Sequence, residues 1–313
     1  MRETTENPMR RIALALASLV LAVPMAGSAP PPKDAPRPLL WKVSDADSTV
    51  YLLGSFHLLK KSDYPLPADV ERAFGDAERL VFEVAPEDLA DPSVPMKMVQ
   101  RALQPGDAAF GKVAPPAVAS KVRAELAKLG LPAAQFDQFE PWMVSITMVT
   151  VLAQKLGYAG EDGLDRHLMQ RAQQAGKPAS GLETLDSQLD AMDATPVAEQ
   201  LASLEESVGE GQDMGARLDE LHAAWRGGDA AALERLAVDE MRTKTPDTYR
   251  RLNVERNRAW MPKIDALLAG KDDALVVVGA VHLLGRDGLV AQMQSRGKRV
   301  ERICTGCTPA KAR

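Results

Sequence analysis

The six-residue pattern Gly-X-X-His-Leu-Leu occurs twice in the sequence, once near each end. The first copy spans residues 54–59 and contains His57, and the second spans residues 279–284 and contains His282. The chain has only four histidines, so this pattern accounts for half of them. Imidazole titrates close to neutral pH and is a common metal ligand. If the fold brings the two side chains together, they can form a metal site or an acid–base pair.

Two glutamates in apolar surroundings extend this set. Glu83 lies within one short apolar segment, and Glu183 ends another. A buried carboxylate without a partner is costly, so each glutamate requires a positive charge nearby. Either a metal ion that the histidines also bind or an arginine, such as Arg256 or Arg72, can supply that charge, and the sequence leaves both open.

Two imidazoles with one or two carboxylates suit Zn²⁺, Mn²⁺ or Co²⁺. A site of two histidines, one carboxylate and an open position can hold an activated water, and a second carboxylate can act as general base. The sequence contains no His-Glu-X-X-His motif, which is the commonest local form of such a site. The candidate metal ligands are therefore His57, His282, Glu83 and Glu183, with one glutamate as the candidate base.

Four further polar residues have a candidate functional role beside a structural one. Ser55 lies two residues before His57 and is a candidate nucleophile, although no Gly-X-Ser-X-Gly elbow surrounds it. Asp165 either supports the site or caps its helix. Arg256 and Asn257 lie on a long charged helix. They either face solvent or reach the sheet edge to orient a carboxylate or a substrate carbonyl.

The elements that must position these residues are short buried strands. Apolar runs at residues 50–53 and 275–278 precede the two histidine motifs, and such runs followed at once by glycine are typical of strands that end in a tight turn. Residues 80–84 and 177–183 predict two more strands, each with a glutamate. Open α/β sheets form ligand sites where their strands end, so we expect the four candidate ligands at one sheet edge.

The rest of the pattern indicates an α/β fold. Further strands are expected at residues 39–43, in a hairpin with 50–53, and at 298–303. Helices are expected over residues 67–74, 115–129, 141–156, 164–175, 197–242, 246–268 and 287–295. A kink or break is expected at Pro262. Because strands alternate with helices near both ends, we expect a mixed central sheet flanked by helices, with helical insertions in the middle of the chain. His167 and His222 fall within predicted helices and are expected to be surface or packing residues.

Residues 1–28 have the organisation of a signal peptide. Two arginines precede an apolar run over residues 12–23, and small residues lead to an expected cleavage point after Ser28. The alternative is a membrane anchor, but the run is shorter than the ~20 residues that a spanning helix needs. Residues 29–38 are rich in proline and predict an extended tether, and residues 308–313 are a tail. We therefore expect a periplasmic or secreted protein.

The mature chain argues against two classes of partner. Segment 141–156 is apolar but short and contains Ser145 and Thr147, so we expect a buried helix and no stable membrane insertion. The net charge of the full sequence is −5 and no basic stripe is present, so nucleic acid is not an expected partner. Cys304 and Cys307 are the only cysteines, and in an exported protein they indicate a structural disulfide.

Several short motifs occur in a distinctive order over residues 39–303. They are Leu53-Gly54-Ser55-Phe56-His57, Ala77-Glu78-Arg79-Leu80-Val81-Phe82-Glu83, Glu140-Pro141-Trp142, Gly163-Leu164-Asp165, Gly181-Leu182-Glu183-Thr184, Glu255-Arg256-Asn257 and Val278-Gly279-Ala280-Val281-His282. In order and spacing they resemble the TraB/GumN family, which is related to the Tiki metalloproteases and, more distantly, to erythromycin-esterase-like proteins.

The resemblance implies a mixed α/β domain over residues 39–307 and, through the Tiki branch, a divalent-metal-dependent peptidase. Carried over by position, His57 and His282 would be metal ligands or acid–base groups. Glu83 and Glu183 would be ligand or base, and Arg256 and Asn257 would support the catalytic site.

The expected function is therefore an exported metal-dependent hydrolase that uses Mn²⁺, Co²⁺ or Zn²⁺ and acts on a peptide or small-molecule substrate. One alternative is a non-catalytic protein that binds a peptide, a metal or heme. Another is a metal-free esterase in which His57 or His282 acts as the base.

Overall fold

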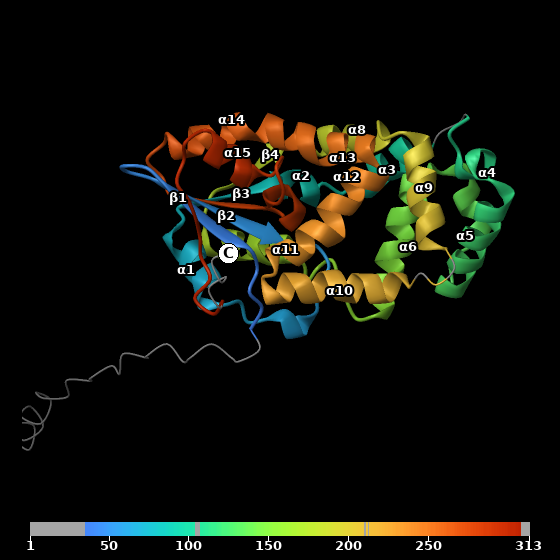
Figure 1. The fold of residues 1–313 in the computed structure, drawn as a ribbon, viewed down its shortest axis with the longest axis horizontal. Helices are drawn as coiled ribbons and strands as arrows, with labels where there is room; N and C mark the ends of the chain where they lie inside the picture. Colours follow the sequence, from blue (N-terminus) through green and yellow to red (C-terminus); the bar gives the residue numbers. More distant parts are fainter. Residues whose placement is uncertain (1–34, 104–106, 210, 212, 308–313) are drawn as a thin grey trace, which may run out of the picture. The chain divides into compact units, whose positions relative to one another are not determined.

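A six-stranded sheet lies at the centre of the computed structural model, which describes residues 35–103, 107–209, 211 and 213–307 (Figure 1). Its strand order is β4-β3-β5-β2-β1-β6. The strands are β1 (Leu40–Ser44), β2 (Thr49–Ser55), β3 (Arg79–Val84), β4 (Ala179–Glu183), β5 (Ala274–Gly279) and β6 (Val300–Arg302). Strand β1 runs antiparallel to β2 and β6, whereas β2, β3, β4 and β5 form parallel pairs. The mixed α/β sheet that the sequence predicts is confirmed.

The central strands form where the sequence is continuously apolar. All six residues of β5 are buried, as expected for a parallel strand that is covered on both faces. The predicted hairpin between β1 and β2 is also present. Its turn is closed by Asp45, whose Oδ1 accepts hydrogen bonds from the amide and hydroxyl of Ser48 at 3.1 and 3.0 Å.

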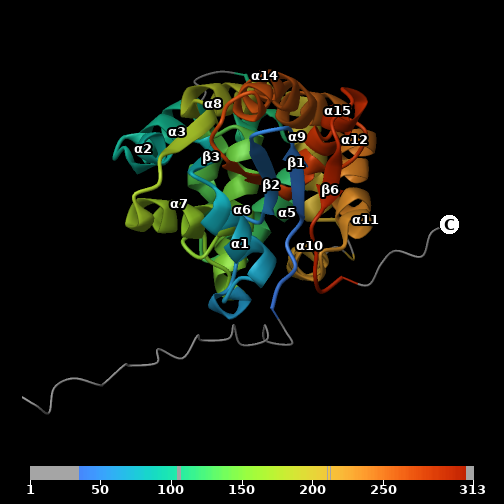
Figure 2. The same ribbon diagram turned by 90° about the vertical axis from the view of Figure 1, so that its left-hand side faces the viewer.

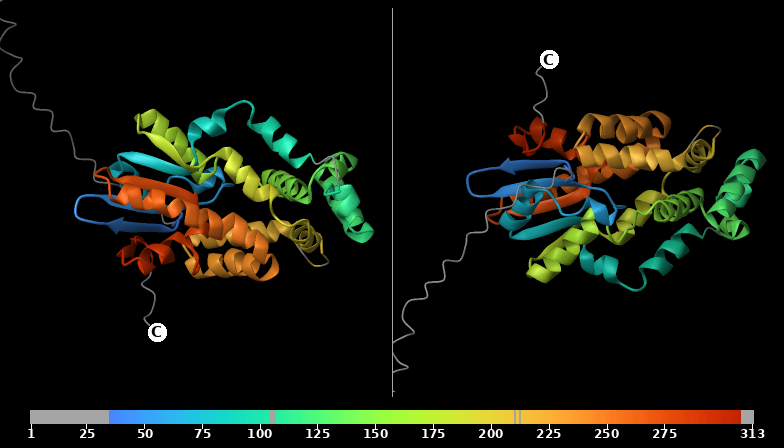
Figure 3. Two further views of the ribbon diagram at one scale, coloured as in Figure 1. Left: turned by 90° about the horizontal axis from the view of Figure 1, so that it is seen from above. Right: turned by 90° about the horizontal axis from the view of Figure 1, so that it is seen from below.

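Helices lie on both faces of this sheet (Figures 2 and 3). They are α1 (Ala68–Asp76), α2 (Pro86–Ala90), α3 (Val94–Ala102), α4 (Phe110–Val113), α5 (Pro116–Leu129), α6 (Pro141–Lys155), α7 (Leu164–Ala175), α8 (Leu185–Asp193), α9 (Val197–Ser207), α10 (Met214–Gly227), α11 (Ala230–Leu233), α12 (Glu240–Lys244), α13 (Pro246–Tyr249), α14 (Arg256–Leu268) and α15 (Leu289–Ser295). Two π-helical segments, Glu234–Asp239 and Arg250–Glu255, and a 3₁₀ turn over Ala280–Leu283 complete the elements that the site uses.

The middle of the chain forms the predicted helical insertion, and it has a hydrophobic cluster of its own. Buried side chains of α4, α5, α6 and α9 meet there, among them Phe110, Val122, Val144 and Leu204. The helix α5 ends where the sequence predicts, because Gly130 adopts the left-handed conformation that favours glycine, with φ of 82°.

Of the kink or break predicted at Pro262, the break is absent, because α14 continues through this residue. Proline removes the amide that would bond to the carbonyl of Arg258, but both residues lie on the exposed face of the helix. Water can therefore satisfy the freed carbonyl. The irregular turn lies earlier, in the π segment Arg250–Glu255 that leads directly into α14.

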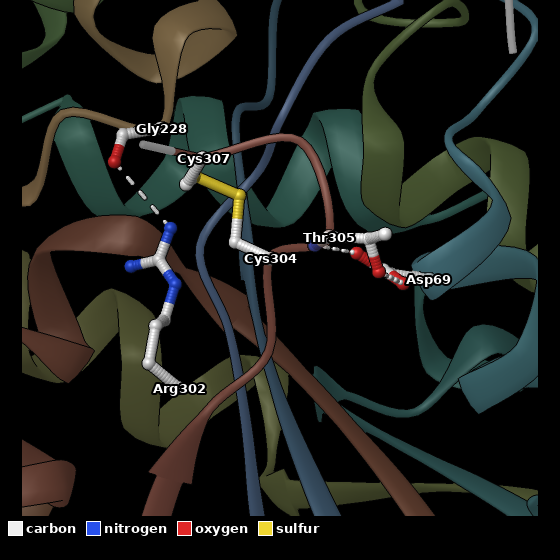
Figure 4. The surroundings of a disulfide bond; sticks show 6 residues. All are labelled: Asp69, Gly228, Arg302, Cys304, Thr305 and Cys307. Atoms are coloured by element: carbon white, nitrogen blue, oxygen red, sulfur yellow. Dashed lines mark hydrogen bonds between the residues drawn. A yellow bond between two sulfur atoms is a disulfide. The ribbon is translucent and has the colours of Figure 1, made fainter. Parts of the chain in front are cut away.

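Cys304 and Cys307 form the expected disulfide (Figure 4). Between them, the amide and the hydroxyl of Thr305 each donate a hydrogen bond of 2.6 Å to Asp69 in the first turn of α1. These contacts attach the end of the described chain to α1.

No helix among the described residues is long and apolar enough to cross a membrane. The expected signal peptide, residues 1–28, and the tail, residues 308–313, lie outside the described residues. Of the expected tether, residues 35–38 are described, and they have no regular secondary structure.

Asp63 is a fully buried acid that anchors the chain segment after His57. Its carboxylate accepts hydrogen bonds from the Lys60 amide at 2.8 Å, from His222 Nε2 at 2.9 Å and from the Arg226 guanidinium. Burial alone would raise the pKa of Asp63, but these donors hold it below its ordinary value. His222 is thus a packing residue, as predicted.

We expect Asp63→Asn to lower the free energy of unfolding by about 3 kcal/mol at neutral pH, because it removes the buried negative charge that Arg226 and His222 contact. A depressed carboxyl pKa contributes stability above the unfolded pKa of about 3.9 and loses it as the pH falls through the folded value. The difference between wild type and variant in urea unfolding should therefore shrink as the pH falls below about 4. A difference that does not change with pH would contradict this account.

Candidate functional site

The carboxyl ends of four parallel strands meet at one edge of the sheet. In the register, Ser55 pairs with Gly279, and Val84 pairs with Glu183. The same edge carries all six predicted site residues: His57, Glu83, Glu183, Arg256, Asn257 and His282. The fold brings them together from five separate parts of the sequence.

Gly279 lies at the centre of this group. A Cβ atom at this position would lie 3.3 Å from Glu83 Oε1, 3.5 Å from His57 Nε2 and 3.6 Å from His282 Cδ2. The Gly279 amide donates a hydrogen bond of 2.7 Å to Glu83 Oε1. Glycine here keeps open a small space on which both motif histidines and one glutamate converge.

Arg256 is the positive partner of both glutamates. Its Nη2 lies 2.6 Å from Glu83 Oε2 and 2.6 Å from Glu183 Oε1, and its guanidinium stacks on the Trp260 ring at 4.7 Å. The three charged side chains are only 10–12% exposed. The sequence left open whether a metal ion or an arginine, Arg256 or Arg72, supplies the positive charge beside the glutamates. The structure shows that Arg256 forms these ion pairs.

The two glutamates differ in what they face. Glu183 accepts hydrogen bonds from Arg256, from Gln188 and from Trp260 Nε1 at 3.2 Å, so its oxygens are committed to neighbouring side chains. Glu83 Oε1 points toward the imidazoles and lies 3.9 Å from His282 Nε2. Burial would raise the pKa of Glu83, but the positive charges around it where it titrates, first His282 and then Arg256 and His57, lower it to about 2.

His282 is buried and neutral, because burial lowers its pKa to about 3. Its Nδ1 lies 2.8 Å from Asn257 Oδ1, while Asn257 Nδ2 donates to Asn253 Oδ1 and to the carbonyls of His282 and Asp287. Since the Asn257 amide donates elsewhere, its oxygen is the acceptor and His282 Nδ1 carries the proton. The lone pair on His282 Nε2 accepts from Arg256 Nη1 at 3.1 Å.

His57 lies nearer the solvent, with 60% of its side chain exposed. Its Nδ1 is 3.1 Å from Asp165 Oδ1, and this carboxylate raises the pKa of His57 to about 9. The Ser55 hydroxyl donates to Asp165 at 2.9 Å. In this arrangement Ser55 bonds to Asp165 and not to His57, so the pair lacks the contact that a serine nucleophile needs.

The N-terminus of α7 approaches the His57 segment closely. The Leu164 amide donates to the Phe56 carbonyl at 3.1 Å, and a Cβ on Gly163 would lie 2.3 Å from the His57 carbonyl oxygen. Glycine at position 163 is therefore required for α7 to place Asp165 beside His57.

We expect the Asp165→Asn substitution to return the pKa of His57 from about 9 toward the ordinary value of about 6.5. The neutral amide keeps the size of the side chain but removes the negative charge that favours the imidazolium. An NMR titration of the histidine ring protons measures this shift, and Ser55→Ala serves as a control that keeps the charge. An unchanged His57 titration in Asp165→Asn would show that another group sets its pKa.

A cavity of about 890 Å³ opens beside these residues. Its lining includes His57, Glu83 and His282, together with many apolar side chains. These side chains are therefore accessible to a molecule larger than water.

The donor types at this edge suit a divalent metal ion. Each motif histidine uses Nδ1 for a side-chain partner, as is typical of histidines that bind an ion through Nε2. With Glu83 they surround the space at Gly279, and Arg256 contacts both Glu83 and Glu183. As they stand, however, the described residues contain no group of three or more His, Cys, Asp or Glu side chains placed to hold an ion. A metal would have to displace the Arg256 contact with His282 Nε2.

Three residues of the cluster were not predicted from the sequence. Gln188 Nε2 contacts Glu83 and Glu183 at 3.2 and 3.3 Å. Trp260 contacts Glu183, and Asn253 contacts Asn257. Helical spacing contained a signal for two of them. Asn253 precedes Asn257 by four residues and Trp260 follows Arg256 by four, which places each pair on one face of a helix.

The chain is similar to a known protein family and to two uncharacterized proteins. Residues 39–302 match the family model described as the TraB/PrgY/gumN family. The chain is also 25% identical over 239 residues to the uncharacterized protein YbaP of Escherichia coli (strain K12) and to that of Shigella flexneri. Each alignment covers 76% of this chain and 85% of the relative.

Proposed function

Because the chain belongs to the TraB/PrgY/gumN family, we propose that it is an exported, metal-dependent hydrolase that acts on peptides. The observation that carries the proposal is the convergence of His57, Glu83 and His282 on the space at Gly279. Export to the periplasm or the medium is part of the proposal, and the Cys304–Cys307 disulfide supports it, since such bonds persist in oxidising compartments.

In this proposal His57, His282 and Glu83 would hold the ion, and Mn²⁺, Co²⁺ or Zn²⁺ would supply a Lewis acid for hydrolysis of a carbonyl compound. Binding requires His57 to lose its proton, because only neutral imidazole is a ligand. Asn257 keeps His282 in the tautomer with an unprotonated Nε2, and Asp165 orients His57. Glu183 fixes the position of Arg256, whose positive charge can stabilise a substrate oxygen that becomes negative.

Catalysis without a metal is a second candidate, and the position of Arg256 favours it. This guanidinium already lies between the two glutamates and donates to His282 Nε2. It could supply the positive charge in an esterase-like reaction in which one motif histidine acts as the base.

A peptide-library digestion with the chain lacking residues 1–28 tests the proposal. We expect cleavage with at least one of Mn²⁺, Co²⁺ and Zn²⁺, loss of cleavage with a chelator, and loss in His282→Ala. His167→Ala is the matched control, because this histidine packs against the Tyr64 ring and does not line the cavity. Cleavage that survives chelation but not His282→Ala would favour the metal-free candidate. No cleavage under any condition would contradict both and favour a binding protein.

A further inference from the structure

The charged side chains that line the cavity fall into two groups. Glu83 is paired with Arg256, and His57 with Asp165. Arg166 and Glu161 are both exposed and line the same cavity, and neither makes a hydrogen bond or ion pair with any described residue. The cavity therefore presents one cation and one anion that no protein group neutralises.

The walls of the cavity are apolar and adaptable. Four methionines line it, and each comes from a different helix: Met98 from α3, Met169 from α7, Met192 from α8 and Met241 from α12. Methionine is unbranched and flexible, so such a wall can pack against apolar side chains of different shapes.

Arg166 lies close to the reacting groups along the chain. It directly follows Asp165, whose Oδ1 is 3.1 Å from His57 Nδ1. Both residues belong to the first turn of α7, which the Gly163 contact holds against the His57 segment. Arg166 and His57 line the same cavity, so a ligand bound to Arg166 lies in the cavity that His57 also lines.

We propose that the cavity binds the C-terminal end of a short apolar peptide, with the terminal carboxylate on Arg166 and apolar side chains against the four methionines. A guanidinium pairs well with a planar carboxylate, through two parallel hydrogen bonds. The negative charge of Glu161 in the same cavity disfavours a dianion such as a phosphate monoester. This proposal rests on the proposed hydrolase function and narrows its substrate class.

An anchored C-terminus places a peptide bond near that end beside the site. Hydrolysis of this bond consumes one water. It releases an amine-bearing C-terminal fragment and leaves a shortened peptide with a new carboxylate. The enzyme would therefore remove residues from the carboxyl end of its substrate.

Equilibrium titration with two matched probes tests the proposal: N-acetyl-trileucine as the free acid and as its C-terminal amide. Mass spectrometry confirms that each probe is intact during the measurement. We expect wild type to bind the acid roughly tenfold more tightly than the amide. Arg166→Gln should remove this preference, whereas Glu161→Gln should keep or increase it. Both variants alter exposed, unpaired side chains, and circular dichroism checks that they fold.

Equal binding of acid and amide, an unchanged preference in Arg166→Gln, or no binding of either probe would overturn the proposal. Hydrolysis measured in parallel separates it from the proposed function. A carboxylate preference without any hydrolysis would retain the binding site and reject the hydrolase. Hydrolysis of acid and amide at equal rates, with equal binding, would retain the hydrolase and reject the role of Arg166.

Discussion

Replacing Arg256 with methionine is expected to lower the free energy of unfolding by about 3–5 kcal/mol, because it leaves two carboxylates buried without a counter-charge. Glu83 and Glu183 are each about nine-tenths buried beside this guanidinium. Their repulsion would add to the cost of burial, and one of them should take up a proton. Urea unfolding at neutral pH measures the change.

Two further variants separate charge from shape at this position. Arg256→Lys keeps the charge but lacks the planar fork that contacts both carboxylates, so we expect an intermediate loss. Combining Arg256→Met with Glu83→Gln and Glu183→Gln removes the charges together and should recover much of the stability. If this triple variant is no more stable than Arg256→Met alone, the loss does not come from unpaired charge.

The second large effect concerns the unequal roles of the two glutamates. We expect Glu83→Gln to lower the rate of peptide hydrolysis by about 10²–10⁴-fold, because Glu83 Oε1 faces the two imidazoles in the open space at Gly279. Glu183→Gln makes the same chemical change in a side chain that faces Arg256 and Trp260. Its effect on the rate of hydrolysis should therefore be much smaller. Steady-state kinetics on one cleaved peptide compares them.

Unfolding measurements on the same two proteins act as the control for this comparison. In each variant the glutamine has nearly the same volume as the glutamate that it replaces. Its amide oxygen can still accept hydrogen bonds. A rate loss in Glu183→Gln as large as that in Glu83→Gln, at equal stability, would contradict the assignment of Glu83 to the reacting space.

The convergence of the candidate site residues could be predicted because these residues lie at strand ends. An apolar run that stops at glycine predicts a buried strand and its end. The topology of parallel strands then requires those ends to share one edge. His57, His282, Glu83 and Glu183 therefore come together by a rule that needs no three-dimensional information.

The partners of these residues could not be predicted in the same way. Asp165 lies 108 residues from His57 in the sequence, and only the docking of α7 through Gly163 brings it near. The direction of Arg256 depends on the rotation of α14, and the π segment before it alters the ordinary residue spacing. A sequence prediction that assumes the regular α-helical period of 3.6 residues per turn does not include this change in residue spacing. The break wrongly expected at Pro262 has a similar origin, since a proline on the exposed face does not end a packed helix.

The proposed function depends most directly on whether the two Gly-X-X-His motifs form one metal site. The decisive measurement is the metal content by mass spectrometry after reconstitution with Mn²⁺, Co²⁺ or Zn²⁺. It compares wild type with the double variant His57→Ala and His282→Ala, and uses His167→Ala as the control. We expect close to one ion per chain in wild type and the control, and almost none in the double variant. No ion in wild type, or equal content in the double variant, would contradict this proposal.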